Sequence, residues 1–326
     1  MQITEKTKDK SILKSEKNKD RKKGANRSFS IGESNYLGLL YVAPWIIGLL
    51  VFTAYPIIAS LFLSFTDYNL LEKAKGVGIQ NYVNLLSDPT FIKAMKVTLK
   101  YVVLEVPLKL AVSLGVAMIL AKKLKAINFF RTAYYIPSIL GSNVAIAVLW
   151  KFLFQSNGLI NQVIQAFGGN PVSWFGEATP ALFTIIFLRV WEFGSTMVIF
   201  LAAIQALPKD VYEAAEVDGS SKVNSFIRIT LPLLSPTIFF NLIMQLISAF
   251  QEFNAPYLIT KGGPQFGTYL LPMYIYDTTF NKNKMGYASA MSWVLFIIIM
   301  ILTMITFKNS KYWVFYGDEE TSKEGK

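Results

Sequence analysis

Long apolar stretches separated by short polar segments dominate the pattern of this chain. A membrane-spanning helix needs roughly 20 mostly apolar residues to cross the hydrocarbon core of a bilayer. Six segments reach that length, and no segment alternates with period two as the strands of a membrane barrel do. The six predicted spans are approximately Leu37–Phe65, Val97–Ala121, Thr132–Phe154, Leu182–Leu207, Leu231–Ile259 and Tyr287–Phe307. The pattern therefore predicts an all-α integral membrane protein with six transmembrane helices.

Prolines inside these segments predict bends or breaks, because proline lacks the backbone N–H group and clashes with the preceding helical turn. The third span is the least regular, since Ser138 and Gly141 dilute the apolar character of its first half. The prolines concerned are Pro44, Pro56, Pro107, Pro137 and Pro236.

Composition agrees with a membrane protein and limits its chemistry. Of the 326 residues, 53% are hydrophobic and only 16% are charged, and the mean hydropathy is +0.39. Such a balance is more apolar than a soluble domain of this size has. Cysteine and histidine are both absent, which excludes disulfides, Cys/His zinc sites and catalytic Ser-His or Cys-His pairs. The sequence has no GxxxxGK[ST] phosphate loop, so we expect no cofactor on this chain, and any nucleotide chemistry must be done by a partner.

Lysine and arginine positions predict the orientation in the membrane, since they are enriched in cytoplasmic segments. With the N-terminus inside, the inner segments hold 21 of these residues and the outer segments hold 8. Both termini are then cytoplasmic, with a basic tail over residues 1–35, a six-span domain over 36–310 and a second tail over 311–326. The first tail places no apolar segment near its start, so no signal cleavage is expected. Its lysines indicate solvent or anionic lipid rather than nucleic acid.

The polar segment between the fourth and fifth spans, residues 208–231, reads as two short helices joined at a glycine. Pro208 and Lys209 suit the start of the first helix, and Gly219 suits its end because glycine adopts the left-handed conformation at little cost. Ser220 or Ser221 suits the cap of the second helix, which we expect to end at Pro232. An ordinary capped connection would show the same signals.

The same loop resembles the cytoplasmic loop of the membrane subunits of ATP-binding cassette importers. In that superfamily the pattern reads EAA, three residues, Gly, then a spaced apolar run that ends in Leu-Pro. Here it stands as Glu213-Ala214-Ala215-x-x-Asp218-Gly219, followed by Phe226, Ile229, Leu231 and Pro232. Further features resemble the carbohydrate-uptake, maltose-type branch. They are Phe130-Arg131 with Pro137-Ser138, Asn157-Gly158-Leu159-Ile160-Asn161, and Gly262-Gly263-Pro264.

The resemblance implies a type I importer permease fold in the bacterial plasma membrane, and partners that this chain does not contain. These are a second, homologous permease subunit, a dimer of cassette ATPases and an extracytoplasmic solute-binding protein. It also implies that the loop is the coupling helix that docks on the ATPase. Alanines give a slim face for close approach, and carboxylates can pair with arginines across an interface. The coupling residues are Glu213, Ala214, Ala215, Asp218, Gly219 and Ser220, where Ser220 replaces the alanine usual after the glycine.

Polar residues inside the spans are costly and mark candidate contacts to a transported solute. Carboxylates, amides and hydroxyls suit the hydroxyl groups of a sugar, and an indole suits its C–H face. The candidates are Ser138, Ser142, Asn143, Arg189, Trp191, Glu192, Ser248, Gln251, Glu252 and Asn254. The resemblance places sugar contacts near the positions of Ser142, Asn143, Ser248 and Glu252.

A structural role is the alternative for each of these residues, because buried charges also pair with one another. Arg189 and Glu192 are i,i+3 neighbours that can neutralise each other, and Glu105 and Lys109 favour a structural i,i+4 pair. Glu252 favours a functional role, because no cation lies within one helical turn of it.

The sequence therefore predicts a permease subunit, without enzymatic activity, that moves a sugar or an oligosaccharide by alternating access. A neutral sugar, uronic acid, amino sugar or glycerol phosphate all remain open as the solute. An ion-coupled secondary transporter would also place polar residues in its spans but would not need the loop at residues 208–231. A channel is disfavoured by the lack of a repeated filter sequence, and a membrane enzyme would need catalytic groups gathered at one depth.

Overall fold

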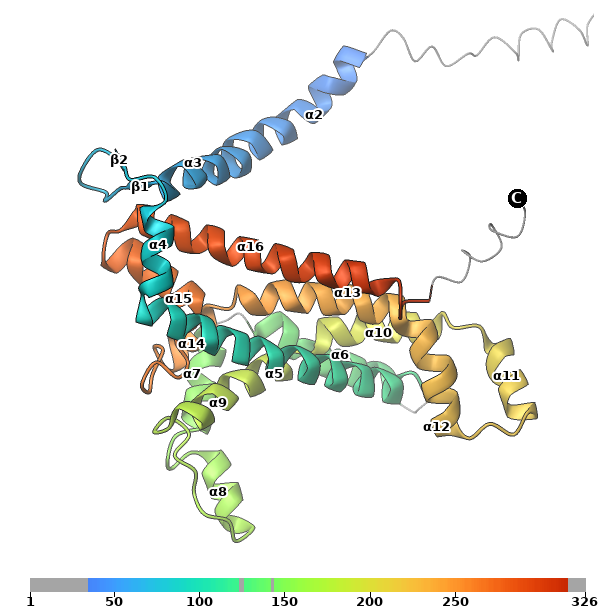
Figure 1. The fold of residues 1–326 in the computed structure, drawn as a ribbon. Coiled ribbons are helices and arrows are strands. Elements are labelled where there is room, and N and C mark those ends of the chain that lie inside the picture. The colour runs from blue at the N-terminus through green and yellow to red at the C-terminus, as the bar shows by residue number, and fades with distance from the viewer. Residues whose placement is uncertain (1–34, 123–125, 142–143, 316–326) are drawn as a thin grey trace, which may run out of the picture. The chain divides into compact units, whose positions relative to one another are not determined.

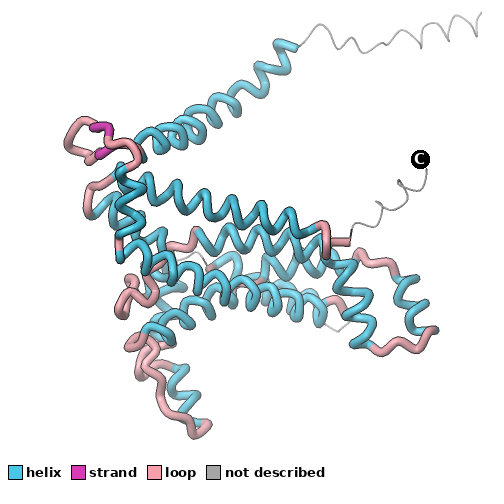
Figure 2. Tube along the Cα trace, viewed as in Figure 1, coloured by secondary structure: helices cyan, strands magenta, loops and turns pink. Residues whose placement is uncertain are grey.

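A computed structural model describes residues 35–122, 126–141 and 144–315 of the chain. The chain divides into two compact units, Met1–Ala59 and Ser60–Lys326. Most of the described backbone is helical, as Figure 2 shows. The one short pair of strands among these residues joins β1 (Thr66–Asp67) to β2 (Lys75–Gly76) in antiparallel register.

The first unit contains α2 (Asn35–Leu49), the π-helical turn η1 (Leu50–Ala54) and the start of α3 (Tyr55–Ser64). The π turn lies directly before Pro56 and accommodates it. A proline leaves the carbonyl group four residues earlier without its helical donor, and one extra residue in the turn relieves the resulting clash. Large apolar side chains such as Trp45 and Phe52 are exposed on this helix, as suits a surface in contact with lipid.

The second unit is a bundle of helices of unequal length (Figure 1). Its helices are α4 (Gln80–Ser87), α5 (Pro89–Leu120), α6 (Ile127–Leu140), α7 (Val144–Leu153), α8 (Leu159–Ala166), α9 (Ala178–Trp191), α10 (Gly194–Gln205), α11 (Lys209–Val217), α12 (Lys222–Ser225), η2 (Phe226–Thr230), α13 (Leu231–Phe250), α14 (Asn254–Ile259), α15 (Leu271–Tyr276), η3 (Asp277–Asn281) and α16 (Met285–Ser310).

Among the described residues, four helices are long and apolar enough to cross a membrane on their own. They are Leu40–Ser64, α5, the stretch Lys222–Ile259, which a short non-helical turn divides after Phe250, and α16. Two bent pairs, α6 with α7 and α9 with α10, raise the number to six if each pair is one span. Each of these six units overlaps one apolar segment of the sequence, so the helical membrane fold is as predicted.

Helix α5 lies in the core of the bundle and packs against α9, α10 and α13. Its buried hydroxyls are satisfied within the helix, because Thr98 Oγ1 donates to the Ala94 carbonyl at 2.8 Å and Ser113 Oγ donates to the Lys109 carbonyl at 2.6 Å. Fully buried alanines such as Ala117 allow neighbouring backbones to approach closely. In lipid, where apolar burial drives little association, such close van der Waals packing holds helices together.

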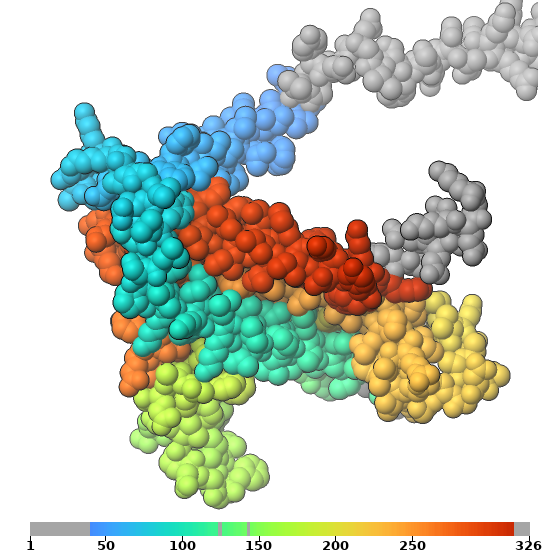
Figure 3. Space-filling view, in the orientation of Figure 1, coloured from blue at the N-terminus to red at the C-terminus, as the bar shows by residue number. Residues whose placement is uncertain are grey.

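The ends of the bundle carry different structures. Helices α11 and α12 form a loop that projects from one end, and Figure 3 shows this loop as a yellow to gold protrusion. Helices α8, α14 and α15 lie at the opposite end, together with α4 and η3 (Figure 1). The two ends of the second unit therefore present separate surfaces.

Candidate functional site

The α11–α12 loop has the helix–glycine–helix form that its sequence predicts. Gly219 has φ +74°, and its N–H donates to the Glu216 carbonyl at 3.0 Å while the Ser220 N–H donates to the Ala215 carbonyl at 2.9 Å. This pair of bonds is a Schellman motif, which satisfies the last carbonyls of α11 and needs a residue that tolerates positive φ. Ser221 caps α12 by accepting from the Asn224 N–H at 3.3 Å, so the second of the two expected capping serines is the cap.

The prediction that the second helix ends at Pro232 is wrong. Helix α12 passes through the π-helical turn η2 into α13 without interruption. Pro232 is the second residue of α13, and the π turn directly before it accommodates the missing N–H group, as η1 does for Pro56. Farther along, Ser235 Oγ donates to the Pro232 carbonyl at 2.6 Å, which is the carbonyl that Pro236 leaves without its helical donor.

A side-chain hydrogen bond ties the first helix of the loop to the base of the fifth span. The Tyr212 hydroxyl lies 2.9 Å from Thr230 Oγ1 and joins α11 to η2. A notch of about 590 Å³ opens between α11 and α12. Its lining residues are Ala215, Asp218, Gly219, Ser220, Ser221, Asn224, Arg228 and Ile229. Glu213 and Ala214 are exposed on α11 beside it.

Three predicted spans are broken, and the breaks lie beside one another. Helix α6 ends at Leu140, α9 ends at Trp191 with a 45° bend into α10, and α13 ends at Phe250 before α14. A break inside a membrane leaves backbone groups without helical partners, and such places commonly form the solute sites of transporters. The ten candidate residues from the sequence all lie within a few residues of these three breaks.

Arg189 joins two of the breaks through a doubly paired, buried guanidinium group. Its Nη1 donates to Glu192 Oε2 at 2.6 Å, and its Nη2 donates to Glu252 Oε1 at 2.7 Å. The side chain of Arg189 is 11% exposed and both carboxylates are 9% exposed. Glu252 Oε1 also accepts from the Ala255 N–H at 2.9 Å, which caps the start of α14. The predicted neutralisation of Arg189 by Glu192 is confirmed.

No cation lies within one helical turn of Glu252 in the sequence, but the structure pairs this carboxylate with Arg189. The partner comes from another span, 63 residues earlier in the chain, and therefore escapes a search within one helical turn. The second expected pair is present, because Lys109 Nζ lies 3.6 Å from Glu105 Oε1 in α5. These five charged groups interact with one another electrostatically.

Ser138, on the neighbouring α6, satisfies backbone groups at the break between α9 and α10. Its hydroxyl donates to the Glu192 carbonyl at 3.0 Å and accepts from the Ser195 N–H at 3.0 Å. Gly194 makes this approach possible, because a Cβ atom there would lie 2.5 Å from the Tyr134 carbonyl oxygen. Gly141 packs against the Glu192 side chain in the same way. The predicted path residues Ser142 and Asn143 lie outside the described residues.

The remaining candidates are exposed rather than paired into the charged cluster. They are Trp191, Ser248, Gln251 and Asn254. The Trp191 ring lies 5.7 Å from the Trp150 ring, whose Nε1 donates to the Thr184 carbonyl at 2.9 Å and fixes its orientation. Gln251 lines an apolar groove of about 550 Å³ between α13 and α16. The breaks thus place charges inside the bundle and uncharged polar groups on its surface.

Sequence reasoning missed a polar cluster at the opposite end of the bundle from the α11–α12 loop. Asp88 accepts from the Tyr274 hydroxyl at 2.6 Å and from the Tyr287 hydroxyl at 2.9 Å. It also caps α5 by accepting from the Thr90 N–H at 2.8 Å. The sequence Asp88-Pro89 is a helix-start signal that would have moved the start of the second helix from Val97 to Pro89. No local signal links Asp88 to residues almost 200 positions later.

A helical membrane bundle with broken spans and a projecting two-helix loop is the arrangement expected of a transport subunit. Residues 112–310 match the family model of the binding-protein-dependent transport system inner membrane component, and the chain belongs to this family. Membership makes it a permease subunit rather than an enzyme.

Relatives and solved structures agree with this family. The chain is 45% identical over 298 residues to the probable ABC transporter permease protein YesP of Bacillus subtilis (strain 168), covering 90% of this chain and 96% of that one. It is 35% identical to the lactose transport system permease protein LacF of Rhizobium radiobacter, covering 83% and 92%. A chain of a bacterial alginate ABC transporter, solved with an alginate pentasaccharide-bound periplasmic protein, has the same fold. Its TM-score is 0.73, with 22% identity and coverage of 87% and 97%.

Proposed function

We propose that this chain forms half of the membrane path of an ATP-driven importer, which carries a sugar or an oligosaccharide by alternating access. The observation that carries the proposal is the unbroken run of α12, η2 and α13 from the loop to the break beside Glu252. A helix transmits a push along its axis, so force on the loop reaches the charged cluster without an intervening flexible joint. The Tyr212–Thr230 bond adds α11 to the same rigid piece.

The exposed polar groups at the breaks suit a sugar. An indole ring offers an apolar face to C–H groups, while amides and hydroxyls exchange hydrogen bonds with sugar hydroxyls. Trp191, Ser248, Gln251 and Asn254 supply these groups, and Ser142 and Asn143 belong to the same proposed path. Arg189, Glu192 and Glu252 hold the broken helix ends together beneath them. The names of relatives that transport lactose, trehalose/maltose and arabinooligosaccharides support this class of solute.

The partners follow from what this chain does not supply. A cassette ATPase dimer, carrying ATP and Mg²⁺, docks on the α11–α12 loop, with Glu213, Ala214, Ala215, Asp218, Gly219 and Ser220 at the contact. A second, similar permease subunit completes the path, and a solute-binding protein delivers the sugar at the opposite end. Both termini lie in the cytoplasm of a bacterial cell, as the distribution of lysine and arginine indicates.

Reconstitution tests this function directly. The chain would be placed in vesicles with its second permease subunit, its ATPase and its binding protein, and uptake of labelled saccharides would be measured. We expect uptake only when ATP is inside the vesicle with the ATPase and loaded binding protein is present on the other side. Uptake that persists without ATP and collapses with an ionophore would instead identify an ion-coupled transporter.

A further inference from the structure

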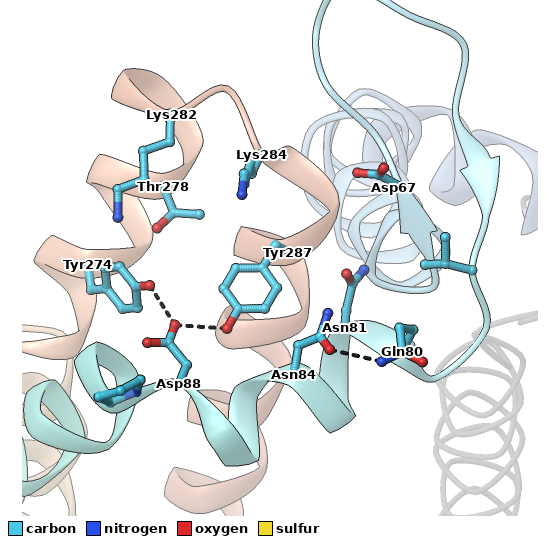
Figure 4. A pocket seen from close by; sticks show the side chains of 12 residues that line it. Asp67, Gln80, Asn81, Asn84, Asp88, Tyr274, Thr278, Lys282, Lys284 and Tyr287 are labelled. Carbon is cyan, nitrogen blue, oxygen red and sulfur yellow. Dashed lines mark hydrogen bonds between the residues drawn. The ribbon is translucent and has the colours of Figure 1, made fainter.

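A polar recess of about 610 Å³ lies at the end of the bundle opposite the α11–α12 loop (Figure 4). One wall comes from β1 and α4, and the other comes from α15, η3 and the start of α16. These segments precede the second span and lie between the fifth and sixth spans, so they meet only in the folded chain. The path described above does not use the recess.

Asp88 lies at the floor of the recess, and the hydrogen-bonding capacity of its carboxylate is fully used. Asp88 accepts from Tyr274, Tyr287 and the first turn of α5, so its carboxylate has no unused capacity for a ligand cation. The two walls touch at Gly286, whose N–H donates to the Tyr68 carbonyl at 3.1 Å. A Cβ atom at Gly286 would lie only 2.0 Å from the Thr66 carbonyl oxygen. The recess is therefore formed before any partner arrives.

The rim carries cations without carboxylate partners. Lys282 and Lys284 are exposed, and neither ammonium group forms a salt bridge within the described part of the chain. Lys282 Nζ instead lies 4.7 Å above the Tyr274 ring centre. Figure 4 shows both lysines on the wall that faces Asp67, Gln80 and Asn84. The wall with the two lysines thus favours an acidic group of a partner. The opposite wall offers amides and a carboxylate to the partner groups that flank this acidic group.

We propose that this recess receives an acidic side chain, with the segment around it, from the solute-binding protein when that protein docks. The inference rests on the proposed function, which places the binding protein at this end. A volume of this size holds several side chains rather than one ion, and exposed lysines attract an acidic protein surface over a distance. Because the two walls belong to α4 and α16, an occupant bridges the helices that lead into the second and sixth spans. Docking therefore acts on the packing of these two spans in the bundle.

Charge reversal at the rim tests the proposal in the reconstituted complex. We expect Lys284→Glu to weaken docking of the loaded binding protein at least tenfold and to reduce its stimulation of ATP hydrolysis, with Lys284→Gln giving a smaller loss. Lys261→Glu is the matched control, because Lys261 is an exposed lysine after α14 that does not line the recess. Equal effects of the two reversals, or none from Lys284→Glu, would overturn the assignment.

Labelling separates a protein occupant from a small acidic solute. The chain has no cysteine, so Lys284→Cys reacts with a hydrophilic maleimide without background. We expect loaded binding protein to slow this reaction severalfold and millimolar galacturonate alone to leave it unchanged. Protection by galacturonate alone would overturn the proposal in favour of a small-carboxylate site. If the loaded binding protein does not stimulate ATP hydrolysis in the wild-type complex, the proposed function itself is refuted. If stimulation is normal and the Lys284→Glu variant is unaffected, only the proposed role of the recess is refuted.

Discussion

Charged side chains inside an apolar bundle persist only where their charge is matched, and Arg189 is matched twice. Moving an ion out of water costs several kcal/mol even after relaxation, so Arg189, Glu192 and Glu252 are mutually dependent. Sequence identified these residues because charges stand out in apolar runs. It paired Arg189 with Glu192 from their spacing alone but could not pair Arg189 with Glu252, because that contact is set by how α9 packs near α14.

Removal of one charge from this cluster is expected to destabilise the protein. Glu252→Gln keeps an oxygen that can accept from the Ala255 N–H but leaves Arg189 with one carboxylate. Breaking a buried ion pair costs about 3–5 kcal/mol, so the melting temperature of the purified complex should fall clearly. Ser248→Ala, an exposed change in the same span, serves as the control and should melt like the wild type. Equal melting of both variants would contradict the ion-pair assignment.

Asp88 should make the stability of the end opposite the α11–α12 loop sensitive to acid. Burial raises the pKa of this carboxyl, but hydrogen bonds from Tyr274, Tyr287 and the Phe91 and Thr90 N–H groups together lower it by more. The net pKa therefore lies below its usual value. A lowered folded-state pKa stabilises the fold above the unfolded value of about 3.9, and this stability disappears as pH falls through the folded value.

Asp88→Asn tests this dependence because asparagine still caps a helix. We expect the variant to be less stable than the wild type at pH 7 by about 1–3 kcal/mol, the usual contribution of hydrogen bonds to a charged group. The difference should shrink as the pH falls below about 4. Denaturant melts of both proteins from pH 7 to pH 3 measure it, and a difference that stays constant with pH would count against the charged carboxylate.

At the scale of elements, the second helix of the loop and the fifth span form one continuous helical stretch. The two-helix form of the loop was readable from Gly219 and the serines, since capping is a local property. The continuation of the helix through Pro232 could not be predicted from the sequence, because a proline normally signals a helix end. The π turn η2 allows the helix to proceed. The prolines predicted bends or breaks, but the breaks after Leu140, Trp191 and Phe250 do not lie at prolines, and hydropathy averages over them.

Gly219→Asp should leave the protein inserted in the membrane but uncouple uptake from ATP hydrolysis. A Cβ atom at Gly219 would meet no atom within 4 Å, but the φ of +74° strains any residue other than glycine. An effect of Gly219→Asp beyond that of Gly219→Asn therefore arises from its charge at the partner. Asparagine and aspartate both tolerate positive φ, which makes Gly219→Asn the matched control for charge. We expect Gly219→Asp to lower sugar uptake at least tenfold in vesicles and Gly219→Asn to lower it less. Normal uptake by Gly219→Asp would remove the loop from the coupling mechanism.

At the scale of the whole molecule, the sequence was sufficient for the class of fold and insufficient for its surfaces. Apolar length is enough to place spans, and the family pattern at Glu213–Gly219 is local. The recess, by contrast, is assembled from residues 67–89 and 274–287, and its walls are joined by the hydrogen bonds of Asp88 and the contact at Gly286. Surfaces made by distant segments depend on the packing of the whole bundle, which no local pattern encodes.

Orientation is the whole-molecule property that connects both proposed partners, and single cysteines measure it. Lys222→Cys on α12 and Gln165→Cys on α8 place exposed thiols at opposite ends of the bundle in a chain without native cysteine. The excess of lysine and arginine on one side predicts that the α12 end is cytoplasmic. A membrane-impermeant maleimide added to intact cells or spheroplasts should therefore label Gln165→Cys and spare Lys222→Cys, while permeabilisation should expose both. The reverse pattern would put the recess on the ATPase side and remove the basis for binding-protein docking there.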